Sequence, residues 1–345
     1  MRGTPQAPAR DLDRLPRLTG LRAVAALVVF AHHARLVAEW RRGEVLEVGY
    51  LGVSLFFVLS GFVLAWATRP GDSAARFYRR RFARIYPAYV VGVALAVLLV
   101  DHPPLGPLLA NLALVQAWVP DLDYSFGVSS PNWSLSCEAF FYAAFPLVLG
   151  LVARRGLRWS CWALGGWWAL TNAATVALSA APGDVPYMAY AHPVLRSGEF
   201  ALGILGCGLV RAGWRPPGGP AAWGVGALAL AVAGARIDPP FPCLDVLLGP
   251  VFAGLVVSSA TADRAGRLGW VSRRPVVYGG QVSYCFYLVH LSVLYRVAGW
   301  GLPAAVYVAV GGVAAVAVSV ALHHGVERPF QRWLSGRPAE RAPAI

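Results

Sequence analysis

The chain has 345 residues, of which 57% are hydrophobic and only 14% are charged. Its mean hydropathy is +0.54, whereas a soluble domain normally carries about 25% charged residues. This composition excludes a soluble enzyme and indicates a protein that crosses a membrane several times. The net charge of +13 comes from 30 arginines, with no lysine, in short loops between apolar runs. We therefore interpret these positive charges as the feature that orients the spans in the membrane, and we expect no nucleic-acid partner.

An α-helix needs about 17–25 mostly apolar residues to cross a bilayer. The segment 105–119 is apolar but short and follows Pro103 and Pro104, which favours a re-entrant or half helix. We expect an all-α polytopic membrane protein with a cytoplasmic segment 1–17, one transmembrane domain over 18–334 and a cytoplasmic tail 335–345. The sequence predicts ten spans, at 18–39, 49–68, 84–100, 133–153, 159–180, 194–211, 220–236, 245–260, 277–297 and 303–322.

The distribution of arginine predicts the orientation of these spans, because short cytoplasmic loops retain positive charge. With the N-terminus inside, 24 of the 30 arginines fall on the inner side, while the outer loop 101–132 contains three Asp and no Arg. We therefore expect both termini in the cytoplasm. Arginine in place of lysine, with abundant Ala, Gly and Pro, also suggests a GC-rich bacterial genome and hence a bacterial cytoplasmic membrane.

Ionisable side chains inside a span are costly and are functional candidates by default. At about 1.5 Å of rise per residue, His33, Glu138, Glu199 and His290 all lie about 20–22 Å above the inner face. Each has a structural alternative. His290 is as well explained by a hydrogen bond to a neighbouring helix, and Glu199 by pairing with Arg196 three residues earlier. His32 and His33 point about 100° apart, so both are not expected in one site.

An arginine-rich run occupies the predicted inner end of the third span. Arg forms two parallel bonds to phosphate and stacks on flat rings. We interpret this run as a binding site for a nucleotide diphosphate carrier, although anionic lipid head groups or a purely topological anchor also fit. The residues are Arg76, Arg79, Arg80, Arg81, Arg84 and Tyr86.

Seven strings in this order resemble the acyltransferase 3 family of integral membrane proteins over about 18–334: LTGLRAVAALVVFAHH, GYLGVSLFFVLSGF, RRRFARIYP, NWSLSCEAFFYAAFP, RSGEFALG, SYCFYLVHL and VERPF. The resemblance implies ten core spans and transfer of acyl groups, often acetyl from acetyl-CoA, to hydroxyls of sugars or natural products. It places the family's Arg and His of the first span on Arg22 and His33, and its carboxylate on Glu138. Where family members often carry an acidic residue, this chain has Ser54, which implies that any role of that carboxylate is absent.

The resemblance and the residues together predict a membrane O-acyltransferase with His33 as the base and Glu138 as the group that holds its ring or orients the acceptor. Arg81, Arg84 and their neighbours would bind the phosphates of acyl-CoA, which is a co-substrate, so we expect no bound cofactor. The five cysteines lack metal-ligand spacing, and we expect no metal. The alternative is a transporter or flippase of a glycan or small metabolite. Supporting roles are predicted for Arg22, His32, Glu199, His290, Asn132, Ser136 and Tyr142.

Overall fold

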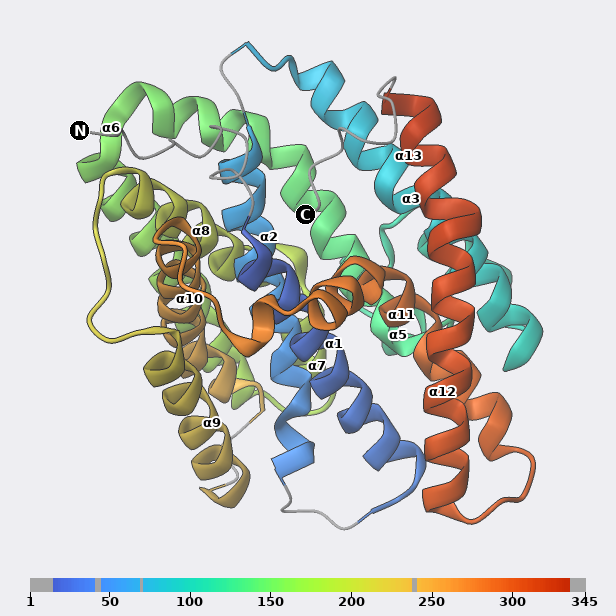
Figure 1. Cartoon of the computed structure of the whole chain (residues 1–345). Helices are drawn as coiled ribbons and strands as arrows, with labels where there is room; N and C mark the ends of the chain where they lie inside the picture. Colours follow the sequence, from blue (N-terminus) through green and yellow to red (C-terminus); the bar gives the residue numbers. More distant parts are fainter. Residues whose placement is uncertain (1–14, 41–44, 69–70, 238–240, 336–345) are drawn as a thin grey trace.

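The computed structural model describes residues 15–40, 45–68, 71–237 and 241–335, and within these ranges all regular elements are helices (Figure 1). Most of the predicted cytoplasmic segments, 1–14 and 336–345, lie outside the described residues. The long helices are α1 (Pro16–Val37), α2 (Gly52–Ala67), α3 (Ala74–Leu99), α6 (Trp133–Ser179), α8 (Pro193–Arg211), α9 (Pro220–Ile237), α10 (Cys243–Arg264), α11 (Arg274–Ala298) and α12 (Ala304–Leu322).

Shorter helical elements connect them. They are η1 (Val45–Leu51), α4 (Leu105–Leu112), η2 (Gln116–Trp118), α5 (Leu122–Phe126), η3 (Ser130–Asn132), α7 (Val185–Ala191), η4 (Trp270–Ser272), η5 (His323–Glu327) and α13 (Arg328–Ser335). In Figure 1, α12 and α13 form one red column, with α11 beside α12.

Eight of the described helical segments are long and apolar enough to cross a membrane. The predicted all-α multi-pass architecture is therefore confirmed. Two of our ten predicted spans lie in α6, which is interrupted at Gly156, where φ is +79° and only glycine is free of strain. The helix α11, in which we predicted a span, is not among the eight segments. The exact number of spans and the side of the termini stay predictions.

The helix α11 lies between other long helices. It packs against α1, α3 and α12, and a continuous run of its residues from Val282 to Leu294 is buried. The helices α2 and α8 meet through their backbones, because a Cβ at Gly61 would overlap the carbonyl of Phe200 and one at Gly203 would overlap that of Val58. Small residues permit this close approach of helices in a membrane.

The predicted re-entrant segment is present as a short folded insertion. Its helix α4 has eight residues, too few to cross a bilayer. The buried Asn111 side chain donates to the carbonyls of Pro107 and Tyr124 at 3.1 and 3.3 Å. The Gln116 side chain donates to the carbonyl of Asn132 at 2.7 Å. These bonds satisfy carbonyl groups of the segment within the protein; its placement in the membrane stays a prediction.

Candidate active site

Two histidines from different helices are hydrogen-bonded at the centre of the candidate site. His33 Nδ1, on α1, lies 3.0 Å from His290 Nε2, on α11. His290 is fully buried, and its Nδ1 lies 3.1 and 2.9 Å from the carbonyl oxygens of Phe286 and Tyr287. The structure therefore brings together two of the four groups that were predicted to share one depth.

The hydrogen-bond pattern assigns the protons of both rings. A carbonyl oxygen only accepts, so His290 Nδ1 carries a proton and its Nε2, in the neutral ring, is an acceptor. His33 Nδ1 must then donate to His290 Nε2. This arrangement leaves Nε2 of His33 as the unprotonated nitrogen of that ring, which is the form a general base needs.

A cavity of about 850 Å³ adjoins His33. Eight of its 23 lining residues are aromatic: Trp40, Tyr50, Phe126, Trp133, Tyr187, Tyr190, Phe241 and Tyr287. We call it the histidine cavity. His32 also lines this space, but its Nδ1 lies 3.1 Å from the carbonyl of Leu46, so that ring ties α1 to η1. The same reasoning leaves Nε2 of His32 unprotonated, so the two adjacent histidines differ in their partners: His33 alone is bonded to a second histidine.

Glu138 lies with the arginines rather than with His33. Tyr142 Oη donates to Glu138 Oε2 at 2.9 Å, and Glu138 is within electrostatic reach of Arg22 and Arg81. We expected Glu138 to hold the His33 ring or to orient the acceptor. The bond that holds the ring comes from His290 instead, and Glu138 belongs to a second cluster.

That second cluster contains three arginines, Arg22 on α1 and Arg81 and Arg84 on α3, which we call the arginine triad. Within the described part of the chain, no hydrogen bond or ion pair engages these three guanidinium groups, and the Nε atoms of Arg22 and Arg81 are buried without a partner. Buried donors without partners are costly, so the triad has unused capacity to bind an anion.

The other members of the predicted arginine run lie elsewhere. Arg80 donates to both oxygens of Asp72, at 3.3 and 3.0 Å, and lines a separate cavity of about 500 Å³. Arg76 lies 3.5 Å from the same carboxylate, and Arg79 is exposed. Tyr86 Oη donates to the carbonyl of Leu112 at 3.1 Å and so connects α3 to α4. The arginine run that we predicted as one binding site is thus divided: Arg81 and Arg84 belong to the triad, and the other members lie elsewhere.

Glu199 forms the ion pair with Arg196 that we gave as its structural alternative, at 3.1 Å. Arg196 also lies 3.3 Å from Asp245 of α10 and donates to Ser54 at 2.9 Å. Ser54 Oγ donates to Asp245 as well. A carboxylate is therefore present beside Ser54, although on a different helix from the one that the resemblance implied. Sequence reasoning missed Asp245 because it occupies the first turn of a predicted span.

This buried group supports the aromatic wall of the histidine cavity. The guanidinium carbon of Arg196 lies 4.9 Å from the ring centre of Tyr190 and 5.8 Å from that of Trp133. Two further predicted site residues lie outside this group. The side-chain nitrogen of Asn132 lies 3.5 Å from the side-chain oxygen of Asn111. The hydroxyl of Ser136 is buried and has no hydrogen-bond partner among the described residues.

Comparison with known proteins identifies the family. The profile of the acyltransferase 3 family, described as an acyltransferase domain, matches residues 15–324. The acyltransferase MdmB of Streptomyces mycarofaciens is 36% identical over an alignment that covers 96% of this chain and 95% of that protein. The peptidoglycan O-acetyltransferase OatA of Listeria monocytogenes is 32% identical over 39% of this chain and 24% of its own length.

An O-acetyltransferase OatA of Staphylococcus aureus is 32% identical over 41% of this chain and 26% of its own. No solved structure matches the chain. The family match and these relatives support a membrane O-acyltransferase. The predicted resemblance is confirmed: this chain belongs to the acyltransferase 3 family.

Proposed function

We propose that the protein transfers an acyl group, with acetyl as the first candidate, from acyl-CoA to a hydroxyl of a sugar or of a glycosylated or hydroxylated metabolite. The observation that carries the proposal is the His290–His33 bond at 3.0 Å, which presents Nε2 of His33 as the base. The proposed location is a bacterial cytoplasmic membrane. The transporter alternative explains neither the family membership nor a histidine held in one tautomer.

The proposed reaction begins at the acceptor hydroxyl. His33 Nε2 removes its proton while the oxygen attacks the carbonyl carbon of the thioester. The C–S bond then breaks, and the CoA thiolate takes the proton back from His33, so that no net proton is consumed. The bond to His290 holds the ring in one orientation throughout, as the third group does in hydrolase triads.

The arginine triad is the proposed binding site for the CoA phosphates. Phosphate accepts paired hydrogen bonds from guanidinium groups, and the triad has buried donors to offer. Arg22 and His33 are eleven residues apart on α1, which is about 16 Å of helix. A pantetheine arm of that order of length would carry the thioester from the triad to the histidine cavity.

The histidine cavity is the proposed acceptor site. Its volume of about 850 Å³ is in the range of pockets that enclose a drug-sized molecule. Aromatic rings bind the apolar faces of sugars and of hydroxylated metabolites equally well, so both acceptor classes stay in the proposal. The names of both OatA relatives favour acetyl as the acyl group, and the name of the Listeria relative favours a glycan hydroxyl as the acceptor.

Acceptor-dependent release of CoA thiol from acetyl-CoA tests this function. We expect purified parent protein in lipid nanodiscs to release thiol and form an ester only when a hydroxylated acceptor is present, and His33→Ala to form none. A transporter would leave the thioester intact under all conditions. Thiol release by His33→Ala at the parent rate would remove His33 as the base while leaving the enzyme class in place.

A further inference from the structure

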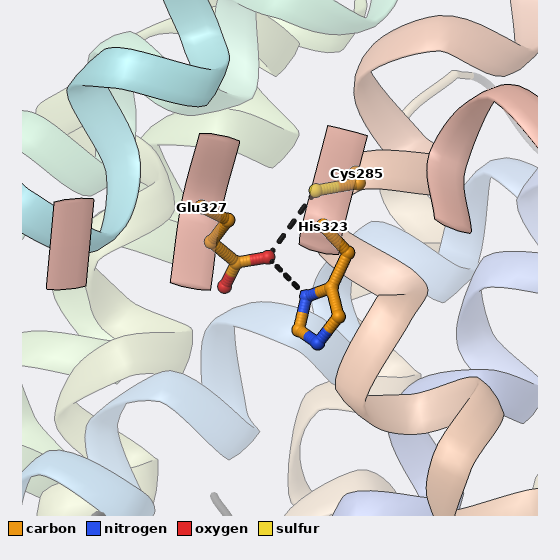
Figure 2. Close-up of side chains that lie close together, drawn as sticks. All are labelled: Cys285, His323 and Glu327. Carbon is orange, nitrogen blue, oxygen red and sulfur yellow. Dashed lines mark hydrogen bonds and ion pairs between the residues drawn. The ribbon is translucent and has the colours of Figure 1, made fainter. Parts of the chain in front are cut away.

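Three side chains with metal-binding atoms, none of which lines the histidine cavity, meet within electrostatic reach of Arg22 and Arg84 of the arginine triad. Cys285 of α11 and the two ends of the π-helical turn η5, His323 and Glu327, point toward one another (Figure 2). All three residues are buried, and their ligand atoms lie within 4.8 Å of one another. The proposed acyl transfer makes no use of the Cys285 thiol or the His323 ring.

The donor atoms converge on one carboxylate oxygen. Glu327 Oε2 lies 3.2 Å from Cys285 Sγ and 2.7 Å from His323 Nδ1. A tetrahedral zinc ion with bonds of about 2.0–2.3 Å sets neighbouring ligand atoms about 3.3–3.7 Å apart. Cys285 Sγ and His323 Nδ1 lie within 4.8 Å of each other, so shifts of about 1 Å, within ordinary side-chain motion, would bring the three atoms to this spacing around an ion.

The surrounding structure holds the carboxylate in place. Gln331 Nε2 donates to the second oxygen of Glu327, Oε1, at 2.9 Å, which is the kind of outer hydrogen bond that orients metal ligands. π-helical turns are rare and occur frequently at functional sites. Here the turn aligns His323 and Glu327, four residues apart, on one side of the chain.

We propose that Cys285, His323 and Glu327 bind one divalent metal ion of the zinc type. Thiolate sulfur, imidazole nitrogen and carboxylate oxygen are the ligands that zinc prefers. A thiolate and a carboxylate neutralise the two charges of the ion, so the buried complex is neutral and does not repel Arg84, which is within electrostatic reach of Glu327. Three protein ligands leave the fourth position to water.

Binding displaces protons in a defined way. The carboxylate of Glu327 only accepts, so His323 Nδ1 carries a proton that must leave this nitrogen before the metal binds there. The Cys285 thiol also loses its proton, because the thiolate is the ligand. Each binding event therefore releases at least the thiol proton, and the metal binds more tightly as the pH rises.

The spacing of cysteines along the chain gave no sign of this site, because one ligand lies in α11 and two in η5. The test is the zinc content of the full-length protein without a histidine tag, after loading with zinc and washing with a weak chelator. We expect about one zinc per chain in the parent and none bound tightly in Cys285→Ser or Glu327→Gln. Cys207→Ser, which changes a buried thiol on α8, should keep the parent content.

Cobalt provides a second, spectroscopic measurement. Cobalt-loaded parent protein should show the charge-transfer absorption of a cobalt–thiolate bond, and Cys285→Ser should lack it. A parent without tightly bound zinc and without this absorption would reduce the trio to a hydrogen-bonded network, and equal zinc in Cys285→Ser would place the metal elsewhere. Both results overturn the proposal. Neither measurement uses an acyl donor or acceptor, so they are independent of the proposed transfer.

Discussion

At the scale of single residues, a base must present an unprotonated nitrogen to the hydroxyl that it activates. Two carbonyls hold the proton of His290 on Nδ1, and His290 in turn holds the proton of His33 on Nδ1. The backbone of α11 therefore determines which nitrogen of His33 is free. In the proposed mechanism, a neutral imidazole performs the orienting role that a carboxylate performs in many triads.

The first prediction separates the two adjacent histidines. We expect His33→Ala to lower kcat by at least the factor of about 10²–10⁴ that a positioned base contributes, while the protein still inserts and unfolds at the parent temperature. His32→Ala should keep substantial activity, because His32 bonds to the Leu46 carbonyl and not to His290. Rates are measured as thiol release from acetyl-CoA. Equal losses in both variants would mean that the two rings act together.

The second prediction concerns His290 as a positioning residue. We expect His290→Ala to lower kcat by about 10- to 100-fold, a part of the contribution of the base, with little change in the KM for the acceptor. The reason is that His290 contacts His33 behind the cavity wall and is not itself a wall residue. A rise in KM with unchanged kcat would instead assign His290 to acceptor binding.

Helix rise alone placed His33 and His290 at one depth, and the structure joins them. The same arithmetic placed Glu138 and Glu199 in that layer, but it is insensitive to the direction in which a side chain leaves its helix. Glu138 points toward Tyr142 and the arginine triad, and Glu199 toward Arg196. Helix rise thus predicted one pair of neighbours, His33 and His290, whereas the partners of Glu138 and Glu199 depend on helix rotation, which one sequence does not specify.

At the scale of helices, Arg196 joins three of them, because it lies on α8 and contacts Ser54 of α2 and Asp245 of α10. The third prediction compares its partners. Arg196→Ala leaves Glu199 and Asp245 buried without a cation and should cost about 3–5 kcal/mol of stability, as the loss of one partner of a buried pair does. Asp245→Asn leaves the Arg196–Glu199 pair intact and should cost much less.

Thermal unfolding in detergent measures both variants. We expect a large fall in the midpoint for Arg196→Ala and a small one for Asp245→Asn. The reverse order, or a midpoint for Arg196→Ala equal to that of the parent, would contradict the assignment of Arg196 as the common partner of the two carboxylates.

The fourth prediction concerns the arginines of α3, of which Arg81 and Arg84 belong to the triad. Arg81→Ala and Arg84→Ala should weaken the binding of CoA, and Arg81→Lys should also lose affinity, because an ammonium group cannot form two parallel bonds. Arg79→Ala, at an exposed position on the same helix, is the matched control. Titration with CoA and dephospho-CoA measures the effect, and parent-like affinity in both triad variants would leave the cluster as a topological anchor.

The helices themselves were largely predictable, because apolar runs of sufficient length correspond to α1, α2, α3 and the later spans. The division of the arginine run between two surroundings was not predictable. Arg80 pairs with Asp72, whereas Arg81 belongs to the arginine triad, because consecutive residues point about 100° apart on a helix. Asp245 was also missed, because its role depends on α2, α8 and α10 meeting at one place.

At the scale of the whole molecule, the arginine triad and the histidine cavity lie at different heights in the bundle. Arg22 and His33 are on the same helix, about 16 Å apart by helix rise. Loops rich in arginine are expected on the cytoplasmic side. If the triad holds the CoA phosphates, the donor enters from that side, while the histidine cavity is nearer to the opposite face.

The last prediction is that donor and acceptor reach the site from opposite faces of the membrane. A nucleotide diphosphate does not cross hydrocarbon cheaply, but a thin uncharged arm can occupy a channel between helices. In oriented proteoliposomes, we expect product when acyl-CoA is supplied only on the side of the arginine-rich loops and the acceptor only on the other side. The alternative is one wide vestibule that admits both substrates from the cytoplasm. Product that forms only when both substrates share the arginine side would establish that vestibule and refute transfer across the membrane.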